Sequence, residues 1–179
     1  MKTLLQLFSI LAFAVLFTAD ASIAQERGPG NGASPNAMVS QTVSNKSTIT
    51  VTYARPGLKG RDMSTLAPSN KVWRTGANES TAITFSTDVM VGGEKIAAGT
   101  YSLYTIPGEN WTFIINNKLS WGTQYDASQD VARIEAAMTT NDAPFMERFA
   151  IYFDELTDNK THLNLHWGTT KTAVPITIE

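Results

Sequence analysis

Short runs of alternating apolar and polar residues, separated by turn signals, recur along most of this chain. Ile49, Val51 and Tyr53 alternate with threonines after a turn at Asn45 and Lys46, a period of two that is typical of half-buried strands. Similar runs follow at residues 82–86, 89–91, 101–106, 111–116, 145–153, 162–167 and 174–178. Because no long stretch with a helical period interrupts them, the sequence predicts an all-β fold, a single antiparallel β-sandwich. Jelly-roll-like and immunoglobulin-like topologies both fit this pattern.

One segment, residues 130–139, fits two periods. Val131, Ile134 and Met138 would share one face of a short helix, whereas Ala132, Ile134 and Met138 fall on one side of a strand. The segments on either side are predicted strands, and we therefore expect a strand here as well.

The first residues have the order of a secretory signal. Lys2 precedes an apolar run over residues 4–17, and small residues stand at Ser22 and Ala24, which is the order of a signal peptide with its cleavage site. The apolar run is shorter than the roughly 20 residues that a membrane-spanning helix needs. We expect a signal peptide over residues 1–24 and an exported protein, in the periplasm or outside the cell, without a membrane span.

Composition indicates how the chain is organised after the expected signal peptide. Residues 25–36, rich in glycine, proline, asparagine and serine, predict a flexible lead-in, and residues 37–179 suit one β-sandwich domain. The chain has no cysteine, and an exported chain without disulfides depends on its core alone. The chain has a net charge of −2 and lacks the broad positive surface that a nucleic-acid-binding protein needs.

Positive charge is concentrated in one segment, residues 55–79. Its cations are Arg55, Lys59, Arg61, Lys71 and Arg74. The acidic residues of the segment are Asp62 and the terminal Glu79, while the chain as a whole is slightly acidic. If the chain binds a ligand, this segment is where we expect the site.

The end of this segment combines an aromatic ring, a guanidinium, an amide and a carboxylate. This mixture suits a polar, anionic or glycan-like ligand. The predicted ligand-binding residues are Arg55, Arg61, Trp73, Arg74, Asn78 and Glu79. In this hypothesis the arginines hold an anionic or hydroxyl group, Asn78 and Glu79 contact it, and Trp73 stacks. The alternative is structural: Glu79 pairs with a cation to fix the loop, and Trp73 fills the end of the core.

Two further classes of function stay open. A hydrolase would use Glu79 as general acid or base and Arg74 to stabilise negative charge. A paired-carboxylate mechanism would also need a second acid about 5 to 9.5 Å from Glu79, for example Asp62, Asp126 or Asp130. The third class is a structural or envelope-interaction domain. We favour a non-enzymatic binding module.

The sequence predicts no metal site and no cofactor. His162 and His166 lie in a predicted strand, where four residues span roughly 13 Å, too far for one zinc ion. With Asn164 between them, they are expected to form a solvated face, opposite core-facing leucines. Residues 126–137 lack the glycine and glutamate of an EF-hand, and no phosphate-binding loop is present.

Several blocks together resemble the domain of unknown function 2911 family. They are Tyr53-Ala-Arg-Pro, Lys59-Gly-Arg, Val72-Trp-Arg-Thr-Gly-Ala-Asn-Glu, Ala98-Gly-Thr-Tyr-Ser-Leu-Tyr-Thr-Ile-Pro and Trp111-Thr-Phe-Ile-Ile-Asn-Asn-Lys. The resemblance extends from about residue 34 to the end of the chain. It implies an exported, β-rich protein of the type found in Bacteroidetes, and the family has no settled activity to carry over.

Overall fold

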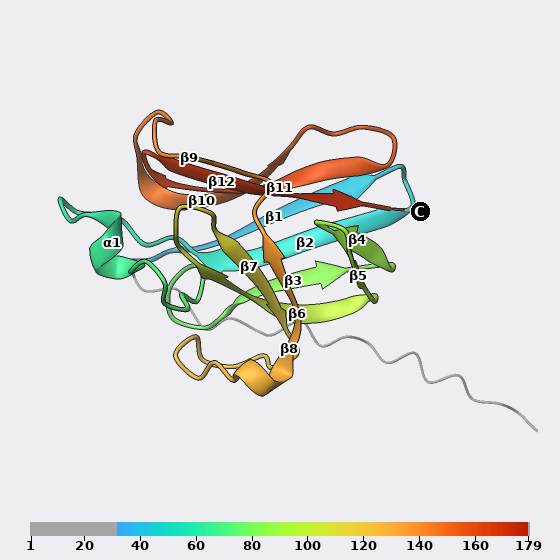
Figure 1. Cartoon of the computed structure of the whole chain (residues 1–179), viewed down its shortest axis with the longest axis horizontal. Helices are drawn as coiled ribbons and strands as arrows, with labels where there is room; N and C mark the ends of the chain where they lie inside the picture. The colour runs from blue at the N-terminus through green and yellow to red at the C-terminus, as the bar shows by residue number, and fades with distance from the viewer. Residues whose placement is uncertain (1–31, 179) are drawn as a thin grey trace, which may run out of the picture.

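Two antiparallel sheets pack face to face in the computed structural model, which describes residues 32–178 (Figure 1). The first sheet has the order β1-β2-β3-β6-β7-β8, and the second has the order β10-β11-β12-β4-β5, with β9 also paired to β12. The first sheet consists of β1 (Asn36–Val43), β2 (Ser47–Ala54), β3 (Thr81–Phe85), β6 (Gly99–Ile106), β7 (Thr112–Asn116) and β8 (Asp130–Glu135). The second consists of β10 (Met146–Asp154), β11 (Lys160–Gly168), β12 (Thr170–Thr177), β4 (Val89–Val91), β5 (Glu94–Ile96) and β9 (Met138–Thr140). The predicted all-β sandwich is confirmed.

Tight turns set the register of the hairpins. Between β1 and β2, Ser44 and Asn45 have φ angles of 56° and 54°, the left-handed pair that a type I′ turn requires. Between β4 and β5, Gly92 has a φ of 57°, and a Cβ atom there would lie 2.3 Å from Cγ2 of Ile134. Glycine is therefore required at this turn, where β5 lies beside β8.

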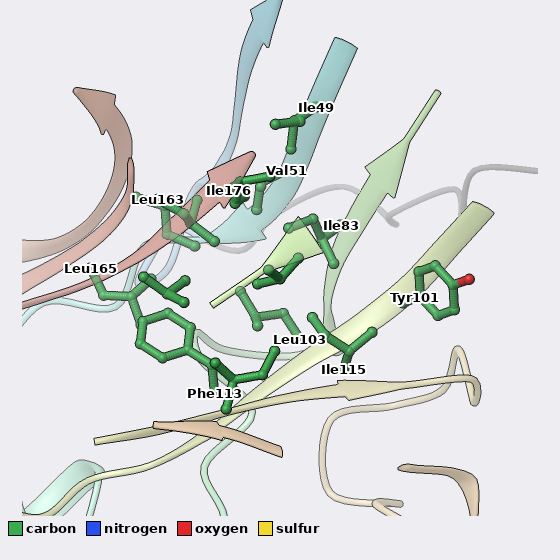
Figure 2. Close-up of a cluster of buried hydrophobic side chains, with 14 of the residues drawn as sticks. Ile49, Val51, Ile83, Tyr101, Leu103, Phe113, Ile115, Leu163, Leu165 and Ile176 are labelled. Carbon is green, nitrogen blue, oxygen red and sulfur yellow. The ribbon is translucent and has the colours of Figure 1, made fainter. Parts of the chain in front are cut away.

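The core lies between the sheets and follows from the period-two pattern. In β2, Ile49, Val51 and Tyr53 are buried while the threonines between them are partly exposed. Figure 2 shows side chains from both sheets meeting in this layer. The first sheet contributes Ile83, Leu103, Phe113 and Ile115, and the second contributes Leu163, Leu165 and Ile176.

The ambiguous segment is extended, as predicted. Residues 130–139 form β8 and the start of β9. In β8 only Ile134 is buried, beside the β4–β5 turn, and the strand pairs with β7 along the edge of the sheet.

The prediction of a solvated histidine face on β11 was wrong. Asn164 is 0% exposed and His166 is 6% exposed, so both sides of the strand are covered. Nε2 of His166 donates to the carbonyl of Pro144 at 2.9 Å, because the loop between β9 and β10 folds over this part of the sheet. His162 is half-buried beside Asp154, at 4.0 Å between Nδ1 and Oδ1.

The predicted signal peptide, residues 1–24, lies outside the described residues, as does most of the predicted lead-in. The described chain enters β1 at Asn36, so the last residue assigned to the lead-in already belongs to the sheet. Within residues 32–178, α1 (Met63–Leu66) and the 3-10 turn η1 (Ala127–Gln129) are the helical elements. No helix in this part of the chain has the length and apolarity to cross a bilayer.

Candidate functional site

The cation-rich segment, residues 55–79, connects β2 to β3 and lies at the end of the sandwich where α1 is drawn (Figure 1). Its first part pairs with the start of β10. The amide of Leu58 donates to the carbonyl of Glu147 at 3.0 Å, and the amide of Phe149 donates to the carbonyl of Pro56 at 3.0 Å. This pairing joins the two sheets at one edge.

The middle and the end of the segment are fixed by other strands and loops. Trp73 and Thr105 exchange two backbone hydrogen bonds of 2.7 and 2.9 Å, which continue the pairing of β6 beyond β3. Further on, the amide of Gly122 donates to the carbonyl of Asn78, and a β-bridge joins Glu79 to Trp121. The loop between β7 and β8 is thereby held against the end of the segment.

Arg55 and Arg61 make structural hydrogen bonds. Nε of Arg55 donates to the carbonyl of Phe149 at 2.9 Å. In Arg61, Nε donates to the carbonyl of Leu58 at 2.9 Å and Nη2 to that of Gly57 at 3.1 Å. Arg61 thus closes the turn at residues 59–60 while its side chain stays exposed at the surface, and Arg55 anchors the segment to β10.

Trp73 belongs to the core. Its ring stacks on Trp167 at 5.5 Å between centroids, and it makes edge contacts with Phe149 and Trp111 at 4.9 and 6.3 Å. Only 6% of Trp73 is exposed. This packing agrees with the alternative hypothesis that Trp73 fills the end of the core. It leaves little of the ring face on which a ligand could stack.

The backbone after Arg74 is strained. Thr75 is fully buried with a φ of 52°, a left-handed conformation that is rare for a β-branched residue. Its hydroxyl lies 3.1 Å from that of Thr105, and its carbonyl accepts from Oγ1 of Thr81 at 2.7 Å. These contacts hold the reversal of the chain just beyond Arg74.

One cavity that the segment lines, here called cavity A, has a volume of about 460 Å³. Its walls include Leu66, Val72, Trp73, Arg74, Gly122 and Tyr125. Arg74 is the one charged side chain among the described residues that line it. Within that same part of the chain, no hydrogen bond or ion pair engages the guanidinium of Arg74.

Two smaller cavities continue along the segment. Cavity B, of about 210 Å³, has walls that include Arg61, Leu66, Trp73, Arg74, Gly76 and Trp167. Cavity C, of about 170 Å³, has walls that include Leu58, Arg61, Asp62, Phe145, Trp167 and Thr170. Neighbouring cavities share walls, so the three lie in a row.

Gly122 lies directly against the side chain of Arg74. A Cβ atom at residue 122 would stand 2.5 Å from Cδ of Arg74 and 2.9 Å from the carbonyl oxygen of Asn78. The absence of a side chain at Gly122 therefore creates the space in which the stem of Arg74 lies. The β7–β8 loop and the cation-rich segment form one wall together.

Tyr125 supplies an aromatic surface to cavity A, and its hydroxyl is already engaged. The hydroxyl donates to Oδ2 of Asp130 at 2.6 Å and accepts from Nη2 of Arg133 at 2.7 Å. Nε of Arg133 also donates to Asp130 at 2.8 Å. Burial, together with the hydrogen bond to Asp130 and its negative charge, raises the pKa of Tyr125 to about 12. The phenol is therefore neutral at physiological pH, and its ring is held in place.

The structure brings together only part of the predicted site. Arg61, Trp73 and Arg74 line the row of cavities, whereas Arg55, Asn78 and Glu79 line none of the three cavities in the described part of the chain. Tyr125 and Gly122 were missed. The adjacent Trp121 and Gly122 are visible in the sequence, but the pairing of Gly122 with Asn78, which brings this loop to the site, is not.

No group of three or more histidine, aspartate and glutamate side chains within residues 32–178 is arranged to hold a metal ion.

A family model described as a protein of unknown function (DUF2911) matches residues 34–176. The match spans most of the chain and nearly all of the described residues, so the chain belongs to this family. Neither a curated protein nor a solved structure matches it.

Proposed function

We propose that this member of the DUF2911 family is an exported, non-enzymatic binding module whose small polar ligand carries an anionic group and occupies cavity A. The observation that carries the proposal is the position of Arg74, a half-buried cation at the wall of a cavity of about 460 Å³. Ligand pockets in proteins commonly measure about 300 to 1,000 Å³ and place a few polar groups among apolar walls.

The walls of cavity A suit a ring that bears a carboxylate. The guanidinium of Arg74 offers a fork of N–H donors, which matches a carboxylate in a bidentate pair. Tyr125 offers the face of its ring, since its hydroxyl is engaged with Asp130 and Arg133. A sugar acid would present C–H groups to the ring and its carboxylate to the arginine.

The proposed export rests on the N-terminal order of cation, apolar run and small residues. We expect the mature protein recovered from the periplasm or the medium of a bacterial host to begin at Gln25. N-terminal sequencing tests this, and a secreted chain that still begins at Met1 would contradict it.

The ligand hypothesis is tested with galacturonate as the anionic probe and galactose as its neutral counterpart. We expect the parent protein to bind galacturonate and not galactose in isothermal titration calorimetry. Arg74→Gln should abolish this binding, because an amide cannot replace the charged fork. Lys71→Gln, which removes an exposed charge that lines none of the three cavities, is the matched control and should bind as the parent does.

The alternatives are outcomes of the same experiment. If the folded parent protein binds neither sugar, the proposal fails for sugar acids. An unchanged melting temperature in Arg74→Gln would then also show that Arg74 does not stabilise the fold. The hydrolase hypothesis depends on Glu79, which lines none of the three cavities in the described chain, so no observation favours it over binding. A structural domain would bind nothing and would lose stability when the loop contacts are broken.

A further inference from the structure

The three cavities share walls, and an arginine stands at each junction. Leu66, Trp73 and Arg74 line both cavity A and cavity B. Arg61 and Trp167 line both cavity B and cavity C. A ligand that passed from A through B to C would therefore meet Arg74 first and Arg61 second.

The charge along this row is predominantly positive. Asp62, in cavity C, is the one carboxylate among the described residues that line the three cavities. Lys59 and Lys71 are exposed in the same segment and add to the positive field. The complement of such a row is a ligand with more than one negative group.

Aromatic side chains are exposed at both ends of the row. Phe145, at the wall of cavity C, is 66% exposed, and Trp121, next to Gly122 of cavity A, is 49% exposed. Tyr125 adds a third ring in cavity A. Exposed aromatic rings that gather beside cavities suit ligand binding, since their apolar faces are open to water and do not contribute to the core.

The backbone is already paired at two places along the row, and this pairing distinguishes between two kinds of chain-like ligand. An extended peptide commonly binds by adding a strand to a free sheet edge. Here the backbone of Trp73 is paired with that of Thr105, and the amide of Leu58 is bonded to the carbonyl of Glu147 in β10. The row therefore offers side chains and ring faces, which suit a sugar chain better than a peptide.

We infer that cavities A, B and C form one extended site for an acidic oligosaccharide, in which Arg74 and Arg61 hold carboxylates on different sugar units. The inference rests on the proposed function of cavity A and adds the class of ligand and a second anion subsite. Linking two weak contacts in one ligand raises affinity without new chemistry, because the second contact forms at high effective concentration.

Oligogalacturonates of one to four units test the inference, because every unit carries a carboxylate. We expect the affinity of the parent protein, measured by calorimetry, to rise about tenfold or more from monomer to tetramer. Arg61→Gln should remove this gain and leave the affinity for the monomer unchanged, whereas Arg74→Gln should weaken the binding of both. Lys71→Gln should retain the gain, since Lys71 lines none of the three cavities.

Arg61 also holds the carbonyls of Gly57 and Leu58, so Arg61→Gln can disturb the turn itself. Phe145→Ala is the second variant, because this exposed side chain lines cavity C and its loss leaves the core intact. It should keep the melting temperature of the parent and reduce the gain with chain length. A gain that survives both substitutions would overturn the second subsite.

The remaining outcomes separate this inference from the proposed function. Monomer binding that depends on Arg74, with no gain in longer chains, would refute the extended site and leave the proposed function standing. Absence of both monomer and tetramer binding would refute both. A methyl-esterified tetramer that binds as well as the acid would overturn the role of the carboxylates. Tetraglutamate that binds with the same dependence on Arg61 would overturn the assignment to a sugar chain.

Discussion

Replacing Gly122 by alanine tests whether the β7–β8 loop sets the position of Arg74. The added Cβ atom would lie 2.5 Å from Cδ and 2.8 Å from Cβ of Arg74, and 2.9 Å from the carbonyl oxygen of Asn78. Real Cβ atoms do not approach other atoms so closely. Rotation of the Arg74 side chain can move Cδ away, but Cβ of Arg74 is fixed by the backbone. The Asn78 carbonyl accepts the backbone hydrogen bond of residue 122 and cannot move without weakening it.

Gly122→Ala should lower the free energy of unfolding, because the added methyl group overpacks a site whose backbone cannot move away. Inserting a methyl group where the backbone cannot yield destabilises proteins by about 1 to 3 kcal/mol. For a chain of this length, 1 kcal/mol corresponds to roughly 2 to 4 °C in melting temperature. We therefore expect Gly122→Ala to melt roughly 2 to 12 °C below the parent and to lose the Arg74-dependent affinity for galacturonate.

The matched control is Gly32→Ala, because a Cβ atom at residue 32 would meet nothing within 4 Å. This variant should melt within about 1 °C of the parent, as surface substitutions away from packed features usually do. Scanning calorimetry and binding titration of the two variants are compared. If Gly122→Ala matches Gly32→Ala in both measurements, the proposed contact between the loop and Arg74 is wrong.

Three further perturbations probe the surroundings of the site. Trp73→Ala should destabilise the fold by about 3 to 5 kcal/mol, because the ring packs on Trp167, Phe149 and Trp111. The melting temperature should therefore drop sharply, and a small drop would refute the core role of Trp73. The folded-state pKa of Tyr125 is raised to about 12 from 10.0, so the stability it contributes is complete below pH 10 and is lost as pH rises through 12. Tyrosinate absorbance of the parent minus that of Tyr125→Phe should show this late step, and a difference centred near pH 10 would contradict it. Asp130→Asn should weaken the hydrogen bonds from Tyr125 and Arg133 and speed amide hydrogen exchange in the β7–β8 loop, whereas unchanged exchange would show that the loop is held elsewhere.

The sheets were predictable because their signal is local. In β2 the alternation of Ile49, Val51 and Tyr53 with threonine maps directly onto the two faces of a strand. The period over residues 130–139 was ambiguous, and β8 was predicted from the strands on either side of it. The histidine face of β11 shows where this reasoning fails. Alternation identifies the side of a strand that faces the core, and it does not reveal that a distant loop, here through Pro144, covers the other side.

The site was only partly predictable because it depends on contacts between distant segments. The arginines and Trp73 stand out in the sequence as a cluster of charge and aromaticity. The neighbours that define cavity A, Gly122 and Tyr125, lie about 50 residues further along the chain and reach it through backbone pairing with Asn78. No local pattern encodes that pairing, and the sequence therefore did not show that the backbones of Asn78 and Glu79 hold the β7–β8 loop.

The strained backbone at Thr75 connects the stability of the loop with the direction of Arg74. A left-handed non-glycine residue costs of order 1 to 3 kcal/mol, and such strain, one residue after the proposed ligand-binding cation, is consistent with a site that fixes its side chain in advance. At ordinary positions glycine is less stable than alanine by about 0.5 to 1 kcal/mol. At a φ of 52° the order should reverse, because alanine retains the Cβ clash and glycine does not.

Thr75→Gly should therefore melt above Thr75→Ala, by roughly 2 to 4 °C for a net difference of about 1 kcal/mol. Both variants lose the hydroxyl contact with Thr105, so this loss cancels in the comparison. Glycine also frees the chain reversal, and the affinity for galacturonate should fall in Thr75→Gly although it is the more stable variant. If Thr75→Ala is the more stable of the two, the backbone at residue 75 is not strained in solution, and the direction of Arg74 must be set by Gly122 and the β7–β8 loop alone.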